Sequence, residues 1–219
     1  MMVEDAGGAT RNQRMRWALL SGFGLAGGLA TGLGLAPPIE ALVGMMLAGP
    51  IVLGIAGSAL GTSQSLAMGR LDRPRALWIG VTAVGFGTGM TLGVVAVETV
   101  GRAILGQQVR LVALSPFERF LGLVLVGSIT GLVVGLAQQM TLRRSRAVAR
   151  RWVSVCLIGF GVGLPGGGLA ADVVLGGLGS PAAFGLFLAV AGLITGLVTA
   201  SEAVRVTTAL DDRGHPTRA

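Results

Sequence analysis

The sequence contains no lysine and no tyrosine, and it has one cysteine and one histidine. The single cysteine, Cys156, cannot form a disulfide within the chain, and the single histidine, His215, excludes histidine-rich metal sites. Charged residues are also scarce, at 12% of the chain compared with about 25% in soluble domains. These deficits exclude an ordinary water-soluble fold and leave few side chains for acid–base or metal chemistry.

Catalytic groups are missing from the apolar part of the sequence. The histidine stands in the polar C-terminal segment, so a Ser-His-Asp triad cannot form, and Cys156 has no histidine or acid at helical spacing. We interpret Cys156 as a small buried apolar residue. No acid falls at the mid-membrane positions that a proton relay or metal site needs. The sequence therefore predicts a protein that is not an enzyme, with neither a metal nor a cofactor.

Hydrophobic residues, by contrast, make up 52% of the chain, and the mean hydropathy is +0.77. Six apolar stretches are long enough for a membrane helix, which needs about 20 residues, and none alternates like a barrel strand. The stretches are roughly 17–35, 39–66, 77–100, 117–140, 152–175 and 182–200. The predicted fold is an all-α polytopic membrane protein with six transmembrane helices. They form one domain, 17–203, between tails at 1–16 and 204–219.

Arginine placement predicts the orientation in the membrane. Fourteen of the seventeen arginines fall before the first stretch, after the last one, or in the second–third and fourth–fifth connections, whereas Arg102, Arg110 and Arg119 fall on the other side. By the positive-inside rule both termini are cytoplasmic, and the all-arginine usage points to a bacterial inner membrane. The net charge of +7 raises the alternative of nucleic-acid binding. Because the basic residues are divided among short juxtamembrane segments, we expect them to contact anionic lipid headgroups and no nucleic acid.

The first apolar stretch has a second interpretation. Arg11, Arg14 and Arg16 precede it, as in a secretory signal peptide. Pro37 follows directly after its last small residue and makes a poor cleavage junction. We therefore expect this stretch to remain in the protein as a structural helix.

An internal repeat is visible by counting from the three tryptophans. Trp17, Trp78 and Trp152 each open an odd-numbered stretch behind arginines, and glycines follow seven, eleven and fifteen residues later. These glycines are Gly24, Gly28, Gly32, Gly85, Gly89, Gly93, Gly159, Gly163 and Gly167. The even-numbered stretches carry a glycine pair and then Gln64, Gln138 or Thr199, and they follow Pro38, Pro116 and Pro181. The pattern predicts three helical hairpins, about 17–66, 77–140 and 152–203, with pseudo-threefold symmetry about the membrane normal.

The glycine stripes have two interpretations. Residues four apart share a helix face, and at 1.5 Å per residue each stripe lies about 10 to 22 Å beyond its tryptophan, in the middle of the bilayer. Small residues at this spacing permit close helix packing in lipid. Alternatively, three equivalent stripes line a central path. Pro165 in the fifth stretch likewise marks either a kink absorbed by neighbouring helices or a broken helix beside a site.

Polar residues at equivalent positions supply further candidates. Gln64, Gln138 and Thr199 lie six residues before an arginine, so we expect them about 9 Å inside the membrane boundary. They serve either as interhelical hydrogen-bonding groups or as a polar ring around a pore. Glu98 and Asp172 each follow their tryptophan by twenty residues and are expected at the outer surface. There they are either solvated or paired with Arg102, Arg110 or Arg119.

Two functions follow from these patterns. The first is a small-molecule transport or pore-type protein with Gln64, Gln138 and Thr199 at the inner end of its path. The second is a structural or accessory subunit whose glycine stripes pack its helices against each other and against a protein partner or a second copy. Stripes that point to a common axis favour the first, and stripes that point to the lipid favour the second.

Two resemblances to known proteins are present. The segment from Gly131 through Gly135, Gln138 and Arg143-Arg144 to Trp152 resembles a repeat in uncharacterised multi-spanning bacterial membrane proteins, which implies the fold but no activity. The chain length, the six helices and Ala26-x-x-x-Ala30 also look similar to the substrate-binding subunits of energy-coupling-factor vitamin transporters. That resemblance implies, as a third alternative, a substrate-binding membrane subunit.

Overall fold

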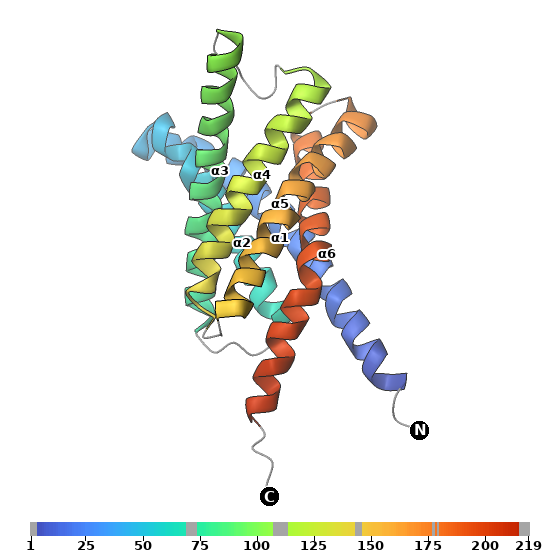
Figure 1. Ribbon diagram of the computed structural model, residues 1–219. Helices are drawn as coiled ribbons and strands as arrows, with labels where there is room; N and C mark the ends of the chain where they lie inside the picture. The colour runs from blue at the N-terminus through green and yellow to red at the C-terminus, as the bar shows by residue number, and fades with distance from the viewer. Residues whose placement is uncertain are drawn as a thin grey trace, which may run out of the picture.

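The computed structural model describes residues 4–68, 74–106, 114–142, 146–176, 178 and 180–214. These residues form six helices, which are α1 (Glu4–Val43), α2 (Met45–Met68), α3 (Arg75–Leu105), α4 (Pro116–Gln139), α5 (Arg146–Leu175) and α6 (Pro181–Gly214). Every one of them contains a span long and apolar enough to cross a membrane. The chain is therefore an all-α, multi-pass membrane protein (Figure 1).

The six helices form a closed ring. Each helix packs along the helix before it and the helix after it in the chain, and α1 packs along α6. α1 begins and α6 ends at the same end of the bundle, and the turns that lead from α3 into α4 and from α5 into α6 lie at the other end (Figure 1). The first end carries the arginines that open α3 and α5 and those near the end of α6, so we name it the arginine-rich end. Arg70, Arg73, Arg110, Arg143, Arg144 and Arg218 lie outside the described residues.

The boundary between the first two helices differs from the sequence prediction. We expected a break at Pro37-Pro38, but α1 runs through both prolines and ends at Val43. The turn is made by Gly44, whose φ of +78° suits glycine and strains other residues. Its N–H donates to the Glu40 carbonyl at 2.9 Å, which closes the last turn of α1. The placement of Pro38 directly before the second helix is therefore wrong, because a positive-φ glycine, and not the prolines, reverses the chain.

Two other proline positions are confirmed. Pro116 and Pro181 are the first residues of α4 and α6, where the missing N–H costs no helical hydrogen bond. Ser115 and Glu118 add a capping box to α4, since each side chain bonds the backbone N–H of the other residue. α1 and α6 also extend beyond the predicted spans, into the segments expected as tails, because no proline interrupts 4–16 or 204–214.

The α1–α2 turn projects sideways from the ring (Figure 1). Its apolar side chains are among the most exposed of the molecule, with Leu42 at 83%, Met45 at 81% and Met46 at 91%. A membrane protein exposes such residues to lipid or to another protein, not to water. We name residues 42–47 the apolar tip.

Candidate functional site in the interior of the helix ring

Three tryptophans meet inside the arginine-rich end of the ring. Trp17, Trp78 and Trp152 are each at most 2% exposed. The ring centroids of Trp17 and Trp152 lie 6.2 Å apart and those of Trp78 and Trp152 lie 5.9 Å apart, both edge-to-face, which is a favourable arrangement for aromatic pairs. α1, α3 and α5 are not neighbours in the ring as far as it is described. These contacts therefore cross its interior and close it.

A second interior contact joins the glutamines that the repeat singled out. Gln138 of α4 donates from Nε2 to Gln64 Oε1 of α2 at 3.2 Å and to Thr82 Oγ1 of α3 at 2.9 Å. Gln138 Oε1 accepts from Trp152 Nε1 of α5 at 3.0 Å. All four side chains are at least 95% buried. One amide thus connects four consecutive helices inside the ring, so Gln138 is the centre of the site.

Thr199 does not join the glutamines. Its hydroxyl accepts from Trp17 Nε1 at 2.9 Å and donates to the Thr195 carbonyl one turn earlier. The structure thus brings Gln64 and Gln138 together and uses Thr199 to bind α6 to α1. In both places a tryptophan N–H donates to the residue at the predicted polar position of the even helix that precedes it around the ring. That helix is α4 for Trp152 and α6 for Trp17.

Sequence reasoning missed two members of this region. Thr82 lies four residues after Trp78, as Ser21 and Cys156 lie four residues after their own tryptophans. A small side chain with a hydroxyl or thiol group at this offset was therefore the available signal. Glu202, one turn after Thr199, is buried with 6% of its side chain exposed and accepts from Arg205 Nη1 at 3.0 Å. Its equivalents by the repeat are Ala67 and Thr141, so no repeated pattern identified it.

The glycine stripes face neighbouring helices, not the axis or the lipid. A Cβ on Gly28 would lie 2.6 Å from Ala59 Cβ of α2, one on Gly89 2.7 Å from Thr130 Cα of α4, and one on Gly163 2.7 Å from the Ala191 carbonyl of α6. The other stripe glycines of each odd helix face the same partner; they are Gly24, Gly32, Gly85, Gly93, Gly159 and Gly167. Each odd helix therefore presents its stripe to the helix that follows it.

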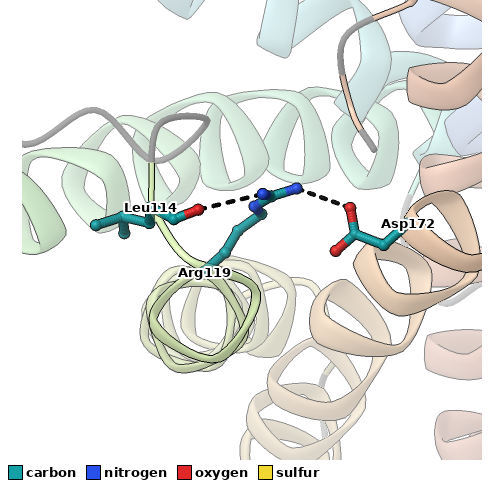
Figure 2. A network of polar contacts seen from close by, with 3 residues as sticks. All are labelled: Leu114, Arg119 and Asp172. Atoms are coloured by element: carbon teal, nitrogen blue, oxygen red, sulfur yellow. Dashed lines mark hydrogen bonds and ion pairs between the residues drawn. The ribbon is translucent and has the colours of Figure 1, made fainter. Parts of the chain in front are cut away.

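At the opposite end an ion pair joins α4 to α5. Arg119 Nη1 lies 2.7 Å from Asp172 Oδ1, and Nη2 donates to the Leu114 carbonyl at 3.2 Å (Figure 2). The two side chains are 14% and 23% exposed, and Arg119 Nε is buried without a partner in the part of the chain that the structure describes. Glu98, the repeat equivalent of Asp172, is half-buried and makes no ion pair with the described residues. Asp172 is thus paired rather than solvated.

This ion pair predicts a measurable coupling energy. In a double-mutant cycle of Arg119→Gln and Asp172→Asn, we expect a coupling of at least about 1 kcal/mol, above the usual value for exposed pairs, because both groups are largely buried. The measurement is the unfolding free energy in mixed micelles. The matched cycle of Arg119→Gln with Glu98→Gln should show no coupling, and equal values in the two cycles would contradict the specific pairing.

Surface grooves lie on the perimeter of the ring. The larger, of about 500 Å³, runs between α2 and α3 and is lined by residues that include Pro50, Gly54 and Gly87. A smaller one, of about 260 Å³, lies between α3 and α4 with Glu118 at its lining. No group of three or more metal-ligating side chains forms among the described residues. The interior polar contacts are therefore the best candidate for a functional site.

No protein-family model, curated protein or solved structure matches this chain. The function must therefore be argued from the site itself.

Proposed function

We propose that this chain is a transport protein for small polar molecules, described here with its interior closed. The observation that supports this proposal is the set of hydrogen bonds from Gln138 to Gln64, Thr82 and Trp152 inside the ring. Polar side chains inside a membrane bundle often mark the route of a solute or ion. These lie inside a ring of helices, where a route would run.

The stability of the folded protein alone is a weak reason for placing glutamines inside the ring. Interhelical hydrogen bonds in membrane proteins contribute only about 0.6 kcal/mol on average, and a buried polar atom without a partner costs about 1–3 kcal/mol. Two such atoms, Trp78 Nε1 and Ser21 Oγ, lie at this end of the ring. A purely structural bundle would be better served by apolar side chains at these places. Incomplete hydrogen bonding is what we expect of a path that polar molecules enter.

Transport requires the interior layers to separate. The tryptophans close the arginine-rich end, and Phe86 and Phe160, with centroids 6.0 Å apart, close the ring one level further in. With both termini in the cytoplasm of a bacterial inner membrane, as the arginines indicate, the tryptophan layer lies on the cytoplasmic side. We propose that its hydrogen bonds rearrange when the path opens.

We further propose that the ring is built from three repeats with pseudo-threefold symmetry. The glycines of each even helix support this, because Gly61, Gly135 and Gly196 lie at the same level against the next odd helix. A Cβ on each glycine would lie within 3.0 Å of the residue that directly follows the tryptophan of that helix. For Gly61 and Gly196 it would also lie within 3.0 Å of the residue four positions after the tryptophan. The hairpins thus meet each other by equivalent contacts.

A structural or accessory subunit is the second candidate, and the apolar tip favours it. Met45 and Met46 are flexible side chains that adapt to varied partner surfaces, and both are more than 80% exposed. The glycine stripes, which serve helix packing, also suit this role. A protein partner or a second copy of the chain would cover the tip, while anionic lipids contact the arginine-rich end.

The experiment is solute flux through liposomes that contain the purified protein. We expect stopped-flow measurements to show faster entry of glycerol or urea than in protein-free liposomes, and Gln138→Leu to remove most of the increase. Gln139→Leu is the matched control, because Gln139 neighbours Gln138 but makes no side-chain hydrogen bond among the described residues. Flux no faster than that of protein-free liposomes for water, neutral solutes and monovalent ions would contradict transport.

A further inference from the structure

One buried indole N–H in the interior lacks the partner that its two equivalents have. Trp152 Nε1 donates to Gln138 at 3.0 Å and Trp17 Nε1 donates to Thr199 at 2.9 Å. Trp78 is only 1% exposed, and its Nε1 is buried without a hydrogen-bond partner among the described residues. By position in the repeat, its partner would be Gln64 of the preceding helix, α2.

The helix register brings Gln64 and Trp78 to the same level. Three residues before the polar position, a glycine of the even helix lies against the residue that follows the tryptophan. For α2 and α3 these are Gly61 and Ile79, where a Cβ would lie 3.0 Å from the Ile79 Cα. The pairs that do form their hydrogen bond have the same contacts, Gly135 with Val153 and Gly196 with Ala18. Gln64 and Trp78 therefore stand as close to each other along the helices as the bonded pairs do.

The Gln64 carbonyl accepts one hydrogen bond, from a side chain of α4. Gln64 Oε1 accepts from Gln138 Nε2 at 3.2 Å. The Gln64 amide nitrogen donates to no other described residue, and Gln64 is 5% exposed. An indole nitrogen is a donor without acceptor capacity, and an amide nitrogen has two N–H groups. The buried indole N–H of Trp78 thus lacks an acceptor among the described residues, and the Gln64 amide N–H groups at the same level donate to none of them.

We propose that Gln64 and Trp78 form a binding site for one small neutral molecule that offers an oxygen acceptor. Water is the smallest such molecule, and alcohols and ureas present the same group. The unpaired groups are N–H donors, so they favour a ligand that offers an oxygen acceptor, and neither donor carries a charge to balance an anion. The site follows from the contacts of α2 and α3 and from the Gln138–Gln64 hydrogen bond, and it does not depend on transport.

The test is NMR of the indole N–H groups in nanodiscs with ¹⁵N-labelled tryptophan. The three tryptophans give three signals, of which two act as internal controls. We expect the Trp78 N–H to receive magnetisation directly from water protons. We also expect the Trp78 N–H to exchange with deuterium about tenfold faster than the N–H groups of Trp17 and Trp152. A tenfold ratio corresponds to about 1.4 kcal/mol, the free energy of the protein hydrogen bond that Trp78 lacks. Substitution of each tryptophan by phenylalanine assigns the signals.

The source of the ligand follows from a titration with glycerol. A Trp78 signal that keeps its water transfer identifies water as the occupant, and a signal that shifts and loses water transfer identifies a larger solute. Gln64→Leu should weaken either response, whereas Gln139→Leu should not. Three indole signals with equally slow exchange and no water transfer would overturn the proposal without any variant. Flux in liposomes is measured separately, so a hydrated site in a protein without flux would contradict only the transport proposal.

Discussion

Replacing Trp152 by alanine is expected to lower the free energy of unfolding by about 3–5 kcal/mol, the usual cost of removing a large buried aromatic side chain. Trp152 is 1% exposed and contacts the rings of both Trp17 and Trp78. Its loss also leaves Gln138 Oε1 without its indole donor. Reversible unfolding in mixed micelles, followed by circular dichroism, measures the change.

Two further variants separate the contributions of Trp152. Trp152→Phe keeps an aromatic ring and loses the N–H, so we expect a cost of about 1 kcal/mol for the hydrogen bond. Trp17→Ala should cost less than Trp152→Ala, because Trp17 pairs with one of the other two tryptophans and Trp152 with both. Equal costs for the two alanine variants would show that Trp152 does not hold the layer together.

Adding one methyl group at Gly131 should destabilise the ring by about 1–3 kcal/mol, the typical cost of overpacking. A Cβ at this position would lie 2.7 Å from the Cys156 carbonyl carbon and 2.8 Å from the Leu157 Cα, so it meets the backbone of α5. A backbone cannot move aside as a flexible side chain can. Gly131→Ala must therefore push α4 and α5 apart.

Gly27→Ala is the control for this substitution. Gly27 lies in a membrane-spanning helix as Gly131 does, and a Cβ there meets nothing within 4 Å. Alanine is the better helix former, so the stability of this variant should stay unchanged or rise slightly. Thermal unfolding of both proteins in the same detergent compares them. A similar loss in both would mean that glycine at Gly131 is not required for close approach.

The number and positions of the helices followed from the sequence because lipid imposes a simple rule. A backbone in hydrocarbon must bond internally, so each apolar stretch of sufficient length becomes a helix. The helix boundary at Gly44 was not predicted, because a proline is a stronger sign of a helix end than one glycine in a chain with 38 glycines. Only the backbone shows that Gly44 takes positive φ while Pro37 and Pro38 remain helical.

The partners inside the site were harder to predict than its members. Counting identified Gln64 and Gln138, but their hydrogen bond joins α2 to α4 across the ring, and a repeat pattern carries no information on such pairs. Thr82 went unnoticed because a threonine in a helix normally bonds its own backbone, as Thr82 also does with Trp78. Asp172 pairs with Arg119. In the repeat that contains Glu98, the position equivalent to Arg119 is occupied by Met45, so Glu98 has no arginine there to pair with.

The closure of the ring by α1 and α6 sets a time order for assembly. The Trp17–Thr199 hydrogen bond joins residues 182 positions apart, so it forms only after the last hairpin has been synthesised. At roughly 5–20 residues per second, this delay is about 10 to 40 s. Throughout that interval the face of α1 around Ser21 and Gly22, which α6 finally covers, faces lipid or an insertion factor. The first of these six helices to be synthesised is thus among the last to complete its contacts.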